Sequence, residues 1–273
     1  MTIRRAFATV PVYVLLTALG LFFLIPLGWP ILASLNPQAT LTVQLPKQWS
    51  LENFTTIIAN GLVIPPFTNS FIIAVSTMLL VIVLSGLAAY PLSRYNFRFK
   101  GPLMYAILFA SALPVLALVT PLYAMYVSLN LVDTLQGVIL FFTASALPFS
   151  IWLMKNFLDT VPLELEEAAW IDGASILGSF VHVLLPLIGP GVAVVGVWSF
   201  IGAWTNFFVP LIVLQSQDLL PASVHIYTFF DAYGQVNYGQ LAAYAMLYAL
   251  PAVVLYTLVS RFFVKGISGG LKG

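Results

Sequence analysis

The side chains best suited to polar chemistry gather in one short segment of this 273-residue chain. Clustered carboxylates can accept charge-assisted hydrogen bonds from Lys, Arg or backbone N–H donors of another protein. The segment is therefore a candidate docking surface, although an ordinary solvated interfacial helix is equally compatible with its composition. It holds five of the nine acidic residues: Asp159, Glu164, Glu166, Glu167 and Asp172.

Catalytic and metal-binding chemistry finds no support elsewhere in the sequence. There is no Cys, so disulfides, thiolate nucleophiles and Cys-based zinc sites are excluded. The two histidines, His182 and His225, have no partner at metal-ligand or catalytic-triad spacing, and we interpret both as structural. No G-x-x-x-x-G-K-[ST] loop is present, so any ATP and Mg²⁺ must be used by another chain. We expect no catalytic residue, no metal site and no cofactor bound by this chain.

The composition is that of a membrane protein. Hydrophobic residues make up 61% of the chain and charged residues only 7%, against about 25% charged residues in soluble domains. A net charge of +1 gives no sign of nucleic-acid binding. A helix needs roughly 20 apolar residues to cross a bilayer, and six charge-free stretches are long enough. We therefore predict an all-α polytopic membrane protein with six transmembrane helices, over residues 10–33, 67–93, 102–129, 134–154, 184–214 and 241–260.

The distribution of basic residues predicts the orientation. Nine of the ten Lys and Arg residues fall on one side of such a six-helix chain, and only Lys47 falls on the other. Because basic residues mark the cytoplasmic side, both termini should be cytoplasmic. The chain then has a cytoplasmic N-terminus (1–9), a transmembrane domain (10–264) and a cytoplasmic tail (265–273). The stretch 53–64 is expected to be an interfacial helix or a loop.

None of the six stretches contains Asp, Glu, Lys or Arg. Ionisable residues inside the membrane usually mark proton relays or voltage sensors, so their absence argues against both. A secondary carrier is weakened but not excluded, because broken helices can bind ions through backbone carbonyls. If the protein moves a solute uphill, the energy is expected to enter from another subunit.

The acidic segment lies in the longest predicted cytoplasmic loop, residues 155–186, here called the acidic loop. Asp159 or Thr160 is a candidate N-cap for a first helix. Gly173 can end that helix, and Ser175 can cap a second one. The loop is thus predicted to be a helix, a glycine turn and another helix.

The same loop resembles the EAA motif of permease subunits from ABC-type importers. Glu167-Ala168-Ala169 is followed after three residues by Gly173 and after nine more by Val183-Leu184-Leu185-Pro186. The family pattern is EAA, three residues, G, nine residues, then I-x-L-P, and only Val183 departs from it. The resemblance covers nearly the whole chain. Three further segments resemble carbohydrate-type members of the family: residues 46–54, residues 204–210 and the Gly-rich tail at 266–273.

The resemblance implies the type I ABC importer permease fold and a multi-subunit transporter in a prokaryotic cytoplasmic membrane. This chain would form half of the pore, as a heterodimer with a second permease subunit above two cytoplasmic ATPase subunits. An external substrate-binding lipoprotein would deliver a carbohydrate, and the ATPases would act on the pore through a helix of the acidic loop. The resemblance assigns this coupling to Glu166, Glu167, Ala168, Ala169, Asp172, Gly173 and Pro186. It assigns a contact with the ATPase dimer to the tail residues Gly270, Leu271, Lys272 and Gly273.

A translocation path is expected along the fifth predicted span, where small and polar residues share one helical face. Close helix–helix packing is the other explanation for such a face. Asn206 is costly to leave facing lipid, and aromatic rings can stack on sugars, although most membrane aromatics are core or interface residues. The path candidates are Ser199, Trp204, Asn206, Tyr244 and Tyr248.

The expected cargo is a disaccharide or oligosaccharide. The spans offer no basic residue to bind a phosphate, which favours a neutral sugar. Glycerol 3-phosphate and glycerophosphodiesters are the alternative cargoes, because similar permeases carry them. A self-sufficient secondary carrier is a third possibility, and it would transport without any ATPase.

Overall fold

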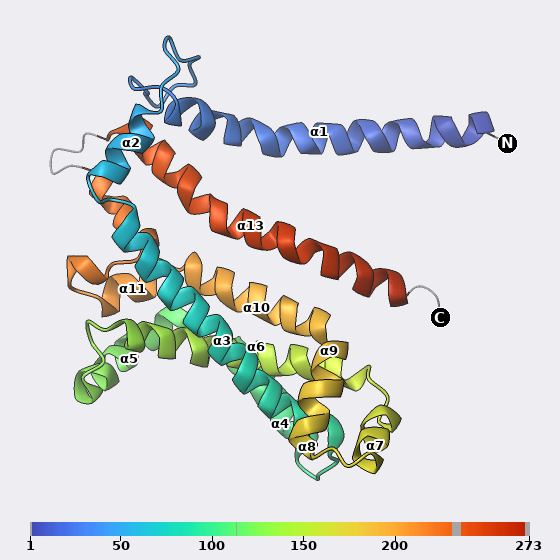
Figure 1. Cartoon of the computed structure of the whole chain (residues 1–273). Coiled ribbons are helices and arrows are strands. Elements are labelled where there is room, and N and C mark those ends of the chain that lie inside the picture. The colour runs from blue at the N-terminus through green and yellow to red at the C-terminus, as the bar shows by residue number, and fades with distance from the viewer. Residues whose placement is uncertain (1, 113, 231–235, 271–273) are drawn as a thin grey trace. The chain divides into compact units, whose positions relative to one another are not determined.

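The structure is a computed structural model and describes residues 2–112, 114–230 and 236–270 (Figure 1). In these residues the regular structure is helical, apart from one isolated β-bridge between Phe230 and Val236. The longer helices are α1 (Thr2–Ser34), α3 (Ile64–Arg94), α4 (Lys100–Ser111), α5 (Val115–Leu129), α6 (Leu135–Asp159), α10 (Gly189–Trp204) and α13 (Tyr238–Gly270). The shorter ones are α2 (Glu52–Ala59), α7 (Glu164–Ile171), α8 (Ile176–Ser179), the π-helix η1 (Phe180–Leu184), α9 (Leu185–Leu187), α11 (Phe208–Val213), η2 (Gln217–Leu219), α12 (Ala222–His225) and η3 (Ile226–Phe229).

Among the described residues, four helices are long and apolar enough to cross a membrane. A fifth span is present if Ile176–Leu187 and Gly189–Trp204, which meet at a bend of 80°, are counted together. The prediction of an all-helical polytopic membrane protein is confirmed, and four of the six predicted stretches each form one long helix. The four candidate spans are Val12–Ser34, Ile64–Arg94, Leu135–Asp159 and Tyr238–Ser260.

The prediction of one helix over residues 102–129 is wrong. α4 ends at Ser111 and α5 begins at Val115, with Pro114 in an extended conformation between them (φ −65°, ψ 118°). Proline has no N–H to donate to the hydrogen bonds of a helix. This charge-free stretch is therefore two short helices.

The predicted stretch 184–214 is also interrupted. Its first break is at Ile188, and Pro190 then stands in the first turn of α10, where a missing N–H costs nothing. The second break follows Trp204. There Asn206 Oδ1 accepts a hydrogen bond from the backbone N–H of Val209 (3.1 Å), which caps the start of α11.

The chain folds as two compact units, and one of the boundaries between them falls inside α13. Unit 1 comprises residues 1–64 and 226–250, and unit 2 comprises residues 65–225 and 251–273. The acidic loop belongs entirely to unit 2.

Unit 1 packs around Asn53 of α2. The buried Asn53 side chain donates from Nδ2 to the carbonyl oxygens of Ser34 (3.0 Å) and Asn36 (3.0 Å). A Cβ at position 239 would lie 2.6 Å from Asn53 Nδ2, so Gly239 is needed for α13 to approach this close. The predicted interfacial element at 53–64 corresponds to α2, whose 8 residues are too few to span a bilayer.

The core of unit 2 lies where α3, α6 and α10 meet the end of the acidic loop. α10 and α6 approach closely, because a Cβ on Gly191 would lie 2.4 Å from Cγ of Phe157. The buried core residues are Val81, Ala89, Met154, Leu158, Val161, Leu184, Ile188 and Val195.

We expect Gly191→Ala to destabilise unit 2, because the new methyl group overlaps the Phe157 ring. Overpacking of this kind costs about 1–3 kcal/mol. The measurement is the thermal unfolding temperature of the purified protein in detergent. Gly189→Ala is the matched control, since nothing lies within 4 Å of a Cβ at that position. Equal unfolding temperatures for the two variants would contradict this packing.

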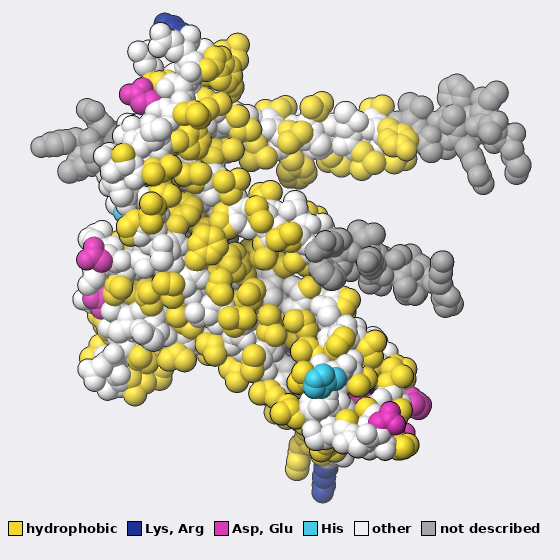
Figure 2. All heavy atoms as spheres, in the orientation of Figure 1, with side chains coloured by type: hydrophobic (Ala, Val, Ile, Leu, Met, Phe, Trp, Pro, Cys, Tyr) yellow, Lys and Arg dark blue, Asp and Glu magenta, His cyan; other side chains and the backbone are white. Residues whose placement is uncertain are grey.

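Many hydrophobic side chains lie on the face of unit 2 that Figure 2 shows. Leu79, Val83 and Leu87 of α3 are each more than half exposed. Apolar exposure on this scale indicates contact with lipid or with another protein. The acidic side chains of the acidic loop gather instead at the end of unit 2 that holds α7 and α8 (Figures 1 and 2).

Candidate functional site

The acidic loop begins later than its sequence suggests. α6 continues to Asp159, whose carboxylate lies 2.5 Å from Nζ of Lys155 one turn earlier. Thr160 therefore ends α6, and α7 begins only at Glu164 without a side-chain cap. The prediction of Asp159 or Thr160 as the N-cap of the first loop helix is wrong, because both side chains bond elsewhere. The Asp159 carboxylate accepts from Lys155 and Ser93, and Thr160 donates from Oγ1 to the Phe157 carbonyl oxygen (2.7 Å).

The turn between the two loop helices is as predicted. Gly173 has a left-handed backbone (φ +88°), a conformation that side chains with a Cβ rarely adopt. Ser175 Oγ then accepts a hydrogen bond from the N–H of Gly178 (3.1 Å) and caps α8. The next segment is η1, a π-helical turn, and such turns are frequent at functional sites.

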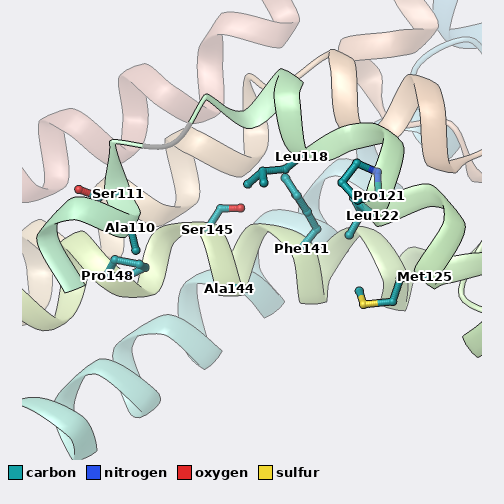
Figure 3. Close-up of a pocket in the computed structure, with 10 residues that line it drawn as sticks. All are labelled: Ala110, Ser111, Leu118, Pro121, Leu122, Met125, Phe141, Ala144, Ser145 and Pro148. Carbon is teal, nitrogen blue, oxygen red and sulfur yellow. The ribbon is translucent and has the colours of Figure 1, made fainter. Parts of the chain in front are cut away.

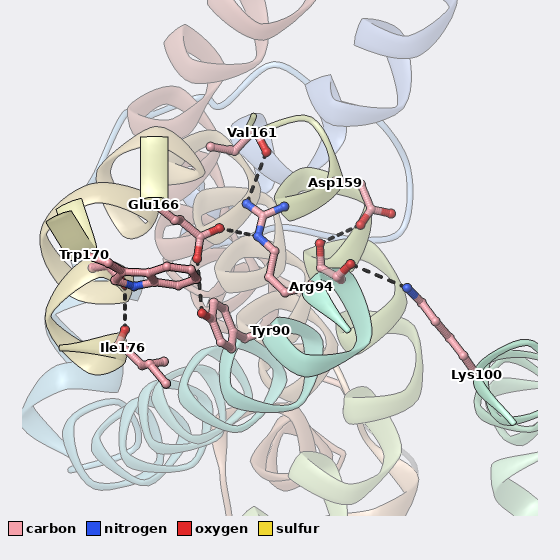
Figure 4. Close-up of polar contacts among 10 residues, drawn as sticks. Tyr90, Arg94, Lys100, Asp159, Val161, Glu166, Trp170 and Ile176 are labelled. Atoms are coloured by element: carbon pink, nitrogen blue, oxygen red, sulfur yellow. Dashed lines mark hydrogen bonds and ion pairs between the residues drawn. The ribbon is translucent and has the colours of Figure 1, made fainter. Parts of the chain in front are cut away.

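One carboxylate of the acidic loop is completely buried. Glu166 forms an ion pair with Nε of Arg94, and it accepts a hydrogen bond from the hydroxyl of Tyr90 (3.1 Å; Figure 4). The Arg94 guanidinium also donates from Nη2 to the carbonyl oxygen of Val161 (3.2 Å). The side-chain exposure is 9% for Arg94 and 0% for Glu166. This contact joins α7 to the end of α3.

A second polar contact lies beside the first. Ser93 of α3 donates a hydrogen bond from Oγ to Asp159 at the end of α6 (2.6 Å), and Lys100 Nζ donates to the carbonyl oxygen of Ser93 (3.5 Å). The end of α3 is thereby bonded to α6 and to the start of α4 as well as to α7. The sequence supplied no signal for these pairings beyond a basic residue at the cytoplasmic end of a predicted span.

The other face of the acidic loop points outward. Glu167, Ala168, Asp172, Gly173 and Pro186 are exposed, and Ala169 is half-buried. Large apolar side chains are exposed beside them, and Ile171 is 86% exposed. Of the predicted coupling residues, the structure thus places Glu166 inside and most of the others on the surface. A mixed acidic and apolar surface of this kind can dock another protein.

The predicted tail contact falls at and beyond the C-terminal end of α13. Gly270 is the last residue of α13, and Leu271, Lys272 and Gly273 lie outside the described residues.

The three path candidates in unit 2 are at least partly enclosed by their own unit. Ser199 is buried and donates from Oγ to the Val195 carbonyl oxygen (2.7 Å). Trp204 is buried and stacks on Phe200, with ring centroids 5.7 Å apart and an interplanar angle of 10°. Asn206 is half-buried and caps α11 as described above. Each side chain thus has a local structural role.

The other two path candidates belong to unit 1. Tyr244 is buried, and its ring centroid lies 5.0 Å from that of Phe229. Tyr248 lies one turn further along α13 and is half-buried. All five path assignments stay predictions.

A cavity of about 420 Å³ lies in unit 2 between α4, α5 and α6, beside Ser111 at the end of α4 (Figure 3). Its lining is mainly apolar and includes Phe141 and the two helix prolines Pro121 and Pro148. Two hydroxyl groups, those of Ser111 and Ser145, are the polar side chains of the described lining, and Ser111 already donates to the Leu108 carbonyl oxygen (2.6 Å). A sugar needs several polar partners, so this cavity is a poor candidate for a sugar site.

Asp133 joins two connecting segments of unit 2. It adopts a left-handed backbone (φ +58°), and its carboxylate accepts hydrogen bonds from Ser216 Oγ (2.5 Å), Ser216 N (2.9 Å) and Gln215 N (2.8 Å). These bonds, led by the one from the Ser216 hydroxyl, hold the pKa of the Asp133 carboxyl below its ordinary value. Sequence reasoning missed this residue because its partners lie more than 80 positions away.

We expect the Asp133 contact to be acid-labile. The contact stabilises the ionised carboxylate and so lowers the Asp133 pKa in the folded state. Its contribution to stability is fully present above the ordinary Asp pKa of about 3.9, and it is lost as pH falls through the lower pKa of the folded state. Hydrogen exchange of the Gln215 and Ser216 amides, corrected for intrinsic rates, should show protection at pH 7 that disappears in strong acid. Asp133→Ala should lack the protection at both pH values. Protection that survives in Asp133→Ala would rule out the carboxylate as its cause.

Comparison with known proteins assigns the chain to a family. The family model of the binding-protein-dependent transport system inner membrane component matches residues 81–268. The chain belongs to this family. The match runs from the middle of α3 through the acidic loop and most of α13.

Curated relatives are similar over nearly their whole length. The maltodextrin transport system permease protein MdxG of Bacillus subtilis is 31% identical over 266 residues, which cover 96% of this chain and 95% of the relative. The diacetylchitobiose uptake system permease protein NgcG of Streptomyces coelicolor is 29% identical over 271 residues, which cover 97% of this chain and 89% of the relative. The expected membership among importer permeases of the carbohydrate type is confirmed.

A solved structure shows the fold. The chain is similar to a chain in the crystal structure of a bacterial ABC transporter that imports the acidic polysaccharide alginate, with a TM-score of 0.81, 20% identity, and coverage of 96% of this chain and 98% of the other. The protein therefore has the ABC importer permease fold. It is a multi-pass permease component of the bacterial inner membrane and is not itself an enzyme. The binding protein and the ATPase of such a transporter are separate components.

Proposed function

We propose that this protein is a permease subunit of an ATP-driven oligosaccharide importer and forms half of its pore with a second, related permease. Relatives at about 30% identity over more than nine-tenths of the chain are named for uptake of diacetylchitobiose, maltodextrin and arabinooligosaccharides, which supports this class of cargo. The charge-free spans favour neutral sugars over glycerol 3-phosphate or glycerophosphodiesters. A binding protein outside the membrane would deliver the sugar.

The acidic loop is the proposed site of coupling to two cytoplasmic ATPase subunits. The observation that carries this proposal is its outward face, where Glu167 and Asp172 are exposed beside Ile171. Ile171 is 86% exposed among the described residues, and an apolar side chain in this position gains free energy from burial against a partner. Glu167 can pair there with a cationic group of the ATPase. The tail residues Gly270 to Gly273 are proposed to contact the ATPase dimer.

The proposed membrane topology keeps six crossings with cytoplasmic termini. α4 and α5 together make the third crossing, and α9 to α11 make the fifth, each as a broken helix. Because the chain has no Cys, single cysteines report topology cleanly. A membrane-impermeant maleimide applied from outside should label Gln44→Cys, and it should label Asn96→Cys only after the membrane is permeabilised. Labelling of Asn96→Cys from outside would overturn this topology.

The function is tested by purification and uptake. A tag at the N-terminus should co-purify a second permease and an ATPase from mild detergent. Proteoliposomes of that complex with its binding protein should import one of maltotriose, diacetylchitobiose and arabinotriose in an ATP-dependent manner, and should not import glycerol 3-phosphate. Recovery of this chain without an ATPase, or ATP-independent uptake, would indicate a secondary carrier instead.

A further inference from the structure

The end of α3 presents one polar face to the acidic loop. Tyr90, Ser93 and Arg94 are spaced i, i+3 and i+4, so they share one side of the helix. Two of them contact Glu166, and the third contacts Asp159. The Tyr90 ring also packs edge-on against Phe180 of η1, with centroids 5.6 Å apart. We call Tyr90, Arg94 and Glu166 the polar clamp (Figure 4).

The covalent route out of the loop is less direct. From α8 the chain passes through the π-helical turn η1 and then an 80° bend at Ile188 before it enters α10. A bend of this size does not transmit a pull along one axis. The polar clamp, in contrast, joins α7 to α3 through buried charged groups that fix both distance and direction.

We propose that α3, and not α10, is the helix that first receives the motion of the acidic loop, and that Glu166 is the positioning residue that makes α7 and the end of α3 move as one body. This inference rests on the proposed docking of the loop to an ATPase. The proposal gives the two adjacent carboxylates, Glu166 and Glu167, different roles. Glu167 faces the partner, while Glu166 faces inward and holds the docked helix on α3.

The burial of the clamp explains why it can act as a rigid joint. Glu166 is completely enclosed, and both of its oxygens are engaged, one by Arg94 and one by Tyr90. Sliding α7 along α3 would break both contacts and leave the carboxylate enclosed without a cation. The polar clamp therefore holds α7 at one position along α3 as long as its charges are present.

The test follows the far end of α3 in the assembled transporter. Thr68→Cys places a single reactive group near the outer end of α3, in a chain that has no other Cys. The N-ethylmaleimide labelling rate of the purified complex is measured without nucleotide and after trapping with ATP, Mg²⁺ and vanadate. These measurements are then repeated with Glu166→Gln, which keeps the shape of the side chain and removes its charge. Two controls are Glu164→Gln, at an exposed carboxylate of the same helix, and Gly189→Ala, at the bend.

The proposal expects trapping to change the labelling rate of Thr68→Cys at least 5-fold in the parent complex. It expects Glu166→Gln to reduce that change to less than 2-fold and both controls to retain it. If Glu166→Gln does not assemble, Tyr90→Phe removes one clamp hydrogen bond and should give an intermediate change. A parent complex without a labelling change, a full change in Glu166→Gln or Tyr90→Phe, or a loss of the change in Gly189→Ala overturns the inference.

Failure of the tagged chain to co-purify an ATPase refutes the proposed function instead. The clamp is then tested in the isolated chain, where Arg94→Gln and Glu166→Gln must have non-additive effects on the unfolding temperature, and additive effects overturn it.

Discussion

The double variant Glu167→Ala and Gly173→Asp is expected to lower ATP-dependent oligosaccharide import at least about 10-fold while membrane insertion is unchanged. Loss of a charged hydrogen-bonding partner costs about 1.5–3 kcal/mol, which corresponds to roughly 10- to 100-fold weaker docking. Gly173 has φ +88°, and an Asp there costs a further ~1–2 kcal/mol of backbone strain. Both changes fall on the outward face of the acidic loop, so the sequence of the membrane-spanning helices and their insertion are unchanged.

The measurements are uptake by proteoliposomes, the amount of ATPase that co-purifies, and the elution profile of the tagged chain in detergent. Glu164→Gln is the matched control, because it removes an exposed carboxylate from the same helix without touching the EAA motif. Coupled import by the double variant at the rate of the parent protein would refute the docking role of the loop.

The sequence predicts the long helices well because lipid imposes a simple rule. A charge-free stretch of sufficient length has to satisfy its backbone hydrogen bonds internally, and a helix does so. The rule does not locate breaks. At Pro114 a missing donor ends one helix, and at Asn206 a side-chain cap starts another, yet both positions lie in stretches that contain no charged residue. No charged residue marks either break, although the backbone hydrogen bonds of the helix are interrupted there.

The acidic loop shows a second limit. Its helix, glycine turn and helix follow from local signals, and the Gly173 turn and the Ser175 cap are confirmed. The sequence cannot say which of its carboxylates is buried, because that depends on a partner brought in by the fold. Tyr90 precedes Glu166 by 76 residues. Adjacent residues on a helix point in different directions, so Glu166 and Glu167 have different surroundings despite their identical chemistry.

The same reasoning changes the view of the path candidates. Small and polar residues along the fifth predicted span fit both pore lining and tight packing, and the described contacts give Ser199, Trp204 and Asn206 each a local structural role. Ser199 bonds to its own helix, and Trp204 lies in a cluster with Phe71 and Phe200. A polar side chain in a membrane span therefore needs a functional explanation only after its local hydrogen bonds have been counted.

The second large effect is expected for Arg94→Ala, which should destabilise the protein by about 3–5 kcal/mol. This change leaves the Glu166 carboxylate buried with only the Tyr90 hydroxyl as a partner, and an uncompensated buried charge carries a penalty of that size.

The double variant Arg94→Met and Glu166→Met separates this penalty from the loss of packing. It removes both charges and keeps apolar volume, so it should recover most of the stability that Arg94→Ala loses. Unfolding temperatures in detergent give the comparison. If the double variant is as unstable as Arg94→Ala, the single-variant loss comes from packing rather than from the buried charge. If Arg94→Ala is as stable as the parent protein, the ion pair does not stabilise the fold. Recovered stability with impaired import in the double variant would show that the clamp couples motion through its charges, because its volume would be intact.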